Sequence, residues 1–174
     1  MSYNNNTPLA SNSSFGVVRS GTNINIASGV ISSTGGSSTI GTWTPTIAVS
    51  NAGTITILVN TANYSKVGQQ ITCYFDFTLL TRVGGSNANT LTLNGLPFTS
   101  IAGTGTVGSL VVSIFQNLKT KWSYISGTVA GSSTSVPLYV IHESEDNVRL
   151  TYADVQVTPM PTRLVGTITY LSIA

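Results

Sequence analysis

The sequence predicts an all-β protein, and three features of its 174 residues support this fold class. Apolar and polar residues alternate along several short segments, which is the pattern of a strand with one buried face. Glycine, serine, threonine and asparagine separate these segments, as turn residues do. No segment has the convincing periodicity of an amphipathic helix. Short strands with such spacing indicate an antiparallel sandwich or barrel, and we predict a jelly-roll-like β-sandwich.

The beginning of the chain is predicted to be a lead-in followed by a short β-structured stem. Residues 1–14 are polar and low in complexity, which is typical of a flexible segment. In the segment 15–32, Ile24 and Ile26 alternate with asparagine, and glycines mark the turns. Strands this short cannot bury their apolar residues alone. We therefore expect this segment to pair with identical copies from other chains.

A second linker separates this stem from the rest of the chain. Residues 32–39 consist of serine, threonine and glycine, a composition typical of flexible linkers. We therefore predict two parts: a flexible lead-in and fibrous attachment stem over residues 1–40, and a head domain over residues 41–174.

The clearest strand of the head covers residues 71–79. An alternating set of apolar residues predicts its buried face: Ile71, Cys73, Phe75, Phe77 and Leu79. An earlier strand, 54–59, is predicted to place Ile55, Ile57 and Val59 on one face. Further strands are expected at 90–93, 110–116, 122–130, 136–142, 148–152 and 164–173.

The surface of the head is predicted to carry very little charge. Apolar residues make up 41% of the chain and charged residues 7%, whereas about 25% is usual for the latter. The formal net charge is +2. A neutral Ser/Thr-rich surface repels other molecules weakly, so such a chain tends to associate unless its surfaces are already paired. This favours an obligate oligomer or a rigid part of an assembly.

Several classes of protein do not fit the sequence. The lysines and arginines are scattered and form no basic stripe, so we expect no nucleic-acid partner. A single cysteine, Cys73, excludes an intrachain disulfide and argues against an oxidising secretory history. No signal peptide is visible and no apolar run is long enough for a membrane span. We expect synthesis in a host cytoplasm and no membrane insertion.

Several stretches resemble the C-terminal receptor-binding regions of phage tail fibres and related viral fibre proteins. One is the segment 14–21 (SFGVVRSG), followed by Ile24, Ile26 and 29–32 (GVIS), which is similar to a short segment that recurs in virion fibre proteins. The others follow in the same order as in that family: 41–46 (GTWTPT), 64–68 (YSKVG), 93–98 (LNGLPF), 150–154 (LTYAD) and 166–171 (GTITYL). The resemblance implies a homotrimer whose head of antiparallel strands lies at the distal end of a fibre. It implies no particular host, and no binding residue can be transferred by position.

The candidate receptor-binding residues are two aromatic and two basic side chains: Trp122, Tyr124, Lys119 and Lys121. Sugars present apolar C–H faces that stack on flat aromatic rings, and Trp122 and Tyr124 would share one strand face. The lysines could attract acidic glycans. Alternatively, Trp122 packs at a seam between subunits, while Trp43 is expected to cap the core.

We expect no catalytic centre, cofactor or metal. The polar run 142–147 (HESEDN) is best interpreted as a solvated hairpin turn, because consecutive side chains point apart. Asp76 and Asp154 could form a glycosidase-like carboxylate pair. We expect instead that Asp76 faces solvent or an arginine of a neighbouring chain. Cys73, on a buried strand face, is expected to be inert.

The sequence therefore predicts a viral fibre head, exposed on the virion surface, that binds a host-surface glycan or protein. Its N-terminal segment would attach to other virion proteins. The alternative is a purely structural virion component, such as a capsid-decorating or fibre-joining protein without a host ligand. Both readings require a β head and a stem, so the sequence separates them poorly.

Overall fold

The computed structural model describes residues 24–27, 30–33, 38–119, 124–141 and 147–173, and it divides into two compact units. The first unit covers Met1–Ser37 and the second Ser38–Ala174. The division lies just before strand β3 (Ser38–Thr42). The domain boundary predicted from the sequence, between residues 40 and 41, falls within this strand.

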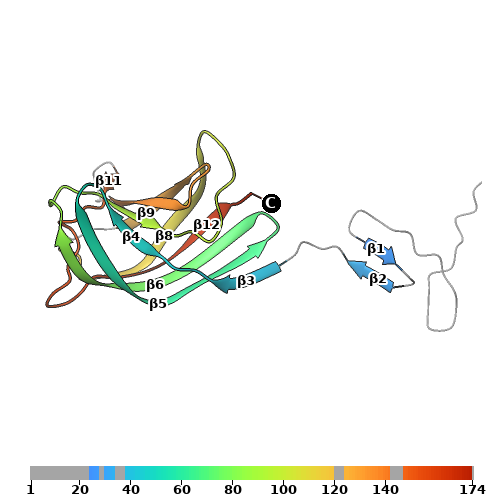
Figure 1. The fold of residues 1–174 in the computed structure, drawn as a ribbon, viewed down its shortest axis with the longest axis horizontal. Helices are drawn as coiled ribbons and strands as arrows, with labels where there is room; N and C mark the ends of the chain where they lie inside the picture. The colour runs from blue at the N-terminus through green and yellow to red at the C-terminus, as the bar shows by residue number, and fades with distance from the viewer. Residues whose placement is uncertain (1–23, 28–29, 34–37, 120–123, 142–146, 174) are drawn as a thin grey trace, which may run out of the picture. The chain divides into compact units, whose positions relative to one another are not determined.

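The described residues of the first unit form an antiparallel hairpin of β1 (Ile24–Ala27) and β2 (Val30–Ser33) (Figure 1). Ile24 lies opposite Ser33, and Ala27 lies opposite Val30. The predicted β structure of this segment is thus present within one chain. Its pairing with other copies stays a prediction.

The described residues of the second unit form ten strands, several of which are labelled in Figure 1. They are β3 (Ser38–Thr42), β4 (Thr46–Val49), β5 (Gly53–Val67), β6 (Gln70–Gly84), β7 (Leu91–Asn94), β8 (Thr106–Gln116), β9 (Tyr124–Ala130), β10 (Ser135–Ile141), β11 (Val148–Arg149) and β12 (Arg163–Leu171). No helix occurs among the residues that the structure describes.

Eight of these strands close into an antiparallel barrel, so the predicted two-sheet sandwich is wrong. Their order is β10-β7-β4-β5-β6-β12-β8-β9, and β9 pairs with β10 again, with Gly127 opposite Leu138 and Tyr124 opposite Ile141. A sandwich requires a break between two sheets, and this last pairing removes it. Closure leaves no exposed edges in the ring of strands, which is its physical advantage. The coarser prediction, an all-β antiparallel fold, is confirmed.

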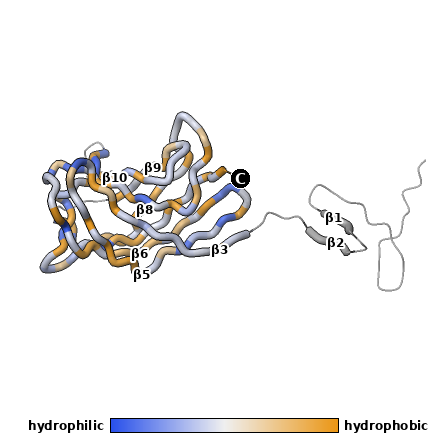
Figure 2. The backbone as a smooth tube through the Cα atoms, viewed as in Figure 1, coloured by the Kyte–Doolittle hydropathy of each residue, from blue (hydrophilic) through white to orange (hydrophobic). Residues whose placement is uncertain are grey.

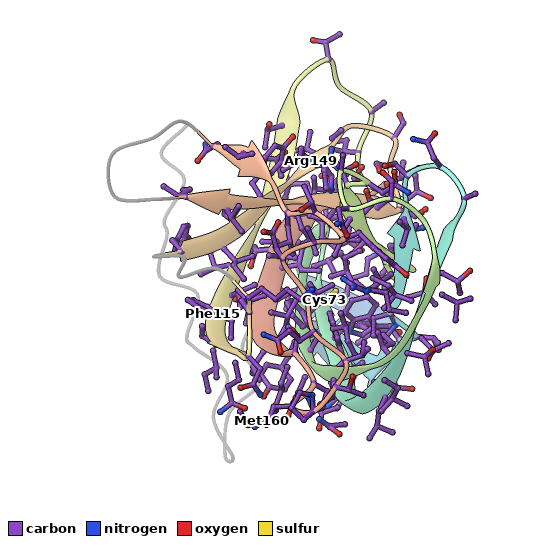
Figure 3. The ribbon with its side chains drawn as sticks, turned by 90° about the vertical axis from the view of Figure 1, so that its left-hand side faces the viewer. Cys73, Phe115, Arg149 and Met160 are labelled. Carbon is purple, nitrogen blue, oxygen red and sulfur yellow. The ribbon has the colours of Figure 1, made fainter. Side chains whose placement is uncertain are left out.

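The core fills the inside of the barrel. The five alternating residues of β6 predicted to be buried are at most 1% exposed. Hydrophobic and hydrophilic residues alternate along the strands in Figure 2, as expected when one side of a sheet faces a core. Cys73 lies inside the barrel (Figure 3), where it is fully buried. Burial raises the pKa of its thiol to about 12. The thiol therefore stays protonated and is a poor nucleophile.

Two irregularities in the pairing of β5 with β6 reset which side chains face outward. Thr56 lies opposite Thr81 but Ile57 lies opposite Leu79, so Leu80 is an extra residue. Asn60 is extra in the same way on β5. An inserted residue shifts the alternation by one. Of the three residues predicted to share a buried face on β5, all of which precede Asn60, Ile55 is buried, Ile57 is half-buried, and Val59, next to the bulge, is 36% exposed.

Candidate functional site

An open groove of about 620 Å³ lies on the outer face of β3, β5 and β6. The residues that line it are Ile40, Gly41, Thr42, Asn63, Tyr64, Ser65, Thr72 and Tyr74. They come from three neighbouring strands, so the groove is built on a hydrogen-bonded sheet rather than on loops.

Strand register places the side chains of the groove in two rows. In the first row, Thr42 lies opposite Asn63, which lies opposite Tyr74. In the second row, Ile40 lies opposite Ser65, which lies opposite Thr72. Residues two apart on a strand point to the same side, so both rows face outward.

Tyr74 and Ile40 provide the large apolar surface of the groove. The exposed fraction is 40% for Tyr74 and 81% for Ile40. The backbone behind Tyr74 is held from within, because the indole Nε1–H of Trp43 donates to the Tyr74 carbonyl at 3.1 Å. Trp43 is 7% exposed and belongs to the core, as expected from the sequence.

Close packing between Gly41 and Tyr64 attaches β3 to the barrel. Gly41 lies opposite Tyr64, and a Cβ at Gly41 would lie 2.7 Å from the Tyr64 hydroxyl oxygen. The Tyr64 ring in turn meets the Phe98 ring edge-on, with 5.2 Å between centroids. The Nζ of Lys66 lies over the Phe98 ring, 4.5 Å from its centroid. Only a glycine leaves room for the Tyr64 ring under β3.

An ion pair lies beside the groove, one position further along the outer face of β6. The guanidinium of Arg163 on β12 donates from Nε and Nη2 to the two carboxylate oxygens of Asp76, at 2.9 and 2.7 Å. The amide of Asn60, the bulged residue of β5, donates to the same carboxylate at 3.0 Å. The hydrogen bond from Arg163, aided by Asn60, lowers the pKa of Asp76 although burial opposes this. The arginine predicted to face Asp76 is thus supplied by the same chain.

A hydroxyl-rich surface continues from the groove onto the neighbouring strands. Thr167 and Thr169 of β12 lie opposite Tyr74 and Thr72, and both are exposed. Ser109 of β8 lies opposite Thr169 and is exposed as well. Short polar side chains thus extend the groove across the sheet without adding charge.

The structure describes only half of the binding residues predicted from the sequence. Tyr124 begins β9 and is 38% exposed, and Lys119 is also exposed, with its backbone N–H donating to the Asp154 carbonyl. Trp122 and Lys121 lie outside the described residues, so their predicted grouping with Tyr124 stays a prediction. The groove itself was not predicted. Its one sequence signal was the outward position of Thr72 and Tyr74 on the predicted strand 71–79.

The two carboxylates among the described residues, Asp76 and Asp154, bind different partners. Asp76 binds Arg163 and Asn60, as above, while Asp154 accepts hydrogen bonds from the backbone N–H and hydroxyl of Thr151, at 2.8 and 2.6 Å. Residues 142–146, most of the predicted polar turn, lie outside the described residues. In the part of the chain that the structure describes, no three His, Cys, Asp or Glu residues gather as metal ligands would. Nor does this part hold a helix long and apolar enough to cross a membrane.

Comparison with known proteins gives a fold similarity and no family. Neither the known protein families nor the curated proteins contain a match. Among solved structures, the Dettilon tailspike protein (gp208) has a similar fold, with a TM-score of 0.62 and 11% sequence identity. The similarity covers 78% of this chain and 24% of the tailspike chain. At this identity the likeness concerns the fold alone.

Proposed function

We propose that this chain is an attachment module of a virion, whose barrel binds a receptor on the host cell surface through the groove of β3, β5 and β6. It would be exposed on the virion, act as a homotrimer, and be fixed to other virion proteins by the segment before Ser38. The receptor is a glycan or a protein.

The composition of the groove is the observation that carries this proposal. An exposed tyrosine and an exposed isoleucine lie among hydroxyl and amide groups on the outer face of a closed barrel. Binding sites combine apolar area with a few polar groups that fix orientation, and tyrosine is favoured at interfaces because one ring supplies both. A sheet holds these groups at little entropic cost.

The two described carboxylates have structural partners, so we do not propose them as a catalytic pair. A glycosidase needs two free carboxyl groups that face one bond. Asp76 is paired with Arg163, and Asp154 accepts hydrogen bonds from its own turn. The fold similarity to a tailspike protein agrees with a place on a virion.

The proposal is tested by binding of the fluorescently labelled protein to a panel of bacterial strains. We expect the wild type to bind at least one strain and Tyr74→Ala to lose most of that binding without a change in melting temperature. Tyr124→Ala, at the site predicted from the sequence, is the comparison variant: it removes a similarly exposed tyrosine from β9 and should keep the binding.

Each other outcome assigns the protein differently. If Tyr124→Ala or Trp122→Ala abolishes binding and Tyr74→Ala does not, the receptor site is the one predicted from the sequence. If no strain binds the wild type, the proposal is wrong and a structural virion component is the better assignment.

A further inference from the structure

We infer that the groove of β3, β5 and β6 selects an uncharged sugar ring, stacked on Tyr74, and discriminates against acidic sugars. This inference rests on the proposed receptor-binding function and adds the class of ligand and the residues that choose it. Three properties of the groove support it: its apolar surface, its neutral hydrogen-bonding groups and its lack of charge.

The exposed ring of Tyr74 can stack on one face of a pyranose ring, and Ile40 adds apolar surface at the far end of the groove. Tyr74 and Ile40 are exposed at opposite corners of the two rows, on β6 and β3. The C–H groups on one face of a sugar are apolar and carry a slight positive charge, which suits the negative face of an aromatic ring. Stacking would remove both the C–H face of the sugar and the face of the Tyr74 ring from water.

The polar groups between these corners can each donate and accept hydrogen bonds. Thr42, Ser65 and Thr72 carry hydroxyls, and Asn63 carries an amide with both a carbonyl and an NH₂ group. Sugar hydroxyls also donate and accept. Neutral groups of this kind can satisfy a sugar hydroxyl in whichever orientation it binds.

None of the described residues that line the groove carries a charged side chain. The next outward residue of β6 after Tyr74 is Asp76, and its charge is neutralised by Arg163 of β12 through two hydrogen bonds. Lys66, which follows Ser65, directs its Nζ over the Phe98 ring. A carboxylate in the groove would therefore lose hydration without gaining a cation, which disfavours acidic sugars.

The test uses matched pairs of oligosaccharides that differ only at C6. Glucose, mannose and galactose oligomers are compared with glucuronate, mannuronate and galacturonate oligomers, first on a glycan array and then by calorimetry. We expect at least one neutral oligomer to bind the full chain about tenfold or more tightly than its acidic counterpart.

Three variants connect the binding to the groove. Tyr74→Ala should weaken the neutral oligomer by about tenfold or more, while Tyr74→Phe, which keeps the ring, should stay within about threefold of the wild type. Thr72→Lys, which places a cation in the second row, should shift preference toward the acidic partner. A melting temperature near that of the wild type confirms that each variant is folded.

Failure of the inference and failure of the proposed function give different results. Acidic oligomers that bind as well as neutral ones, or Tyr74→Ala that binds like the wild type, overturn the inference while cell binding stands. The same holds if the protein binds cells but none of the oligomers. If the protein binds neither cells nor oligomers, the proposed function fails and takes the inference with it.

Discussion

At the scale of single residues, Tyr170 fixes the loop after β7 to the last strand of the barrel. Its hydroxyl donates to the Phe98 carbonyl at 2.9 Å and accepts from the Phe98 N–H at 3.2 Å. The ring is 2% exposed, and burial raises the pKa of its hydroxyl above the ordinary value. One side chain thus satisfies both backbone groups of Phe98, a residue that lies outside the strands.

We predict that Tyr170→Phe lowers the free energy of unfolding by about 1–3 kcal/mol, because both Phe98 groups lose their partner. Denaturant unfolding measures this. Tyr152→Phe is the control: the Tyr152 hydroxyl is buried and has no hydrogen-bond partner among the described residues. Its removal should leave stability unchanged or raise it. Equal changes in the two variants would show that the hydrogen bonds to Phe98 contribute no net stability.

The Cys73 thiol gives the fold an alkaline limit. Its pKa is about 12 when folded, against an ordinary value of 9.0. Above pH 9 the unfolded chain releases this proton and the folded chain does not, so stability is intact below pH 9 and falls between pH 9 and 12. The slope is at most about 1.4 kcal/mol per pH unit. Cys73→Ala should be less stable throughout but lack this part of the slope, as measured by urea unfolding across pH 9. An unchanged slope would assign the alkaline loss to other groups.

At the scale of elements, the Asp76–Arg163 pair connects β6 to β12 beside the groove, and Asn60 adds β5. The folded pKa of Asp76 is below its ordinary 3.8, so this contribution is present above that pH and is lost as pH falls through the folded pKa. We predict that Asp76→Asn lowers the melting temperature at neutral pH and loses less stability than the wild type on acidification. Parallel acid curves for the two proteins would contradict this.

Gly166 on β12 allows β8 to approach closely where the register of that pair shifts. A Cβ at Gly166 would lie 2.3 Å from the Val111 carbonyl oxygen and 2.8 Å from the Phe75 ring. The backbone contact cannot relax by a change of rotamer. Gly166→Ala should therefore cost about 2 kcal/mol or more, as overpacking in a core does. Gly105→Ala, in open space, is the control and should cost little. Similar melting curves for both variants would rule out this packing role.

At the scale of the whole molecule, a closed barrel with little charge still exposes large apolar side chains. Leu58, Leu80 and Ile114 are each about half exposed, at 51%, 47% and 47%. Such side chains favour association when repulsion between like charges is weak. The β1–β2 hairpin adds a second element, whose two strands pair with each other and with no other described strand.

We predict that the full chain is a homotrimer in solution. Light scattering should give about three times the chain mass of 18.1 kDa at micromolar concentration. If the exposed side chains of Leu58, Leu80 and Ile114 lie in the interface between subunits, the charged replacements Leu58→Lys and Ile114→Lys should favour the monomer. A monomeric wild type would overturn the prediction.

The sequence by itself determined the strands and the contents of the core. Alternation along 71–79 placed Phe75 and Phe77 inside and Tyr74 outside, because the side-chain period of a strand is local and fixed by backbone geometry. The burial of Trp43 and Cys73 followed from the same kind of reasoning.

Only the tertiary structure decided which strands are neighbours. The β9–β10 pairing that turns a sheet into a barrel, the partner of Asp76 on β12, and the groove made by Ile40, Asn63 and Tyr74 all join residues from separate strands. The bulges at Asn60 and Leu80 also depend on a partner strand. Local patterns specify a face and leave the partner open, because pairing is a long-range choice set by register, closure and packing of the whole sheet.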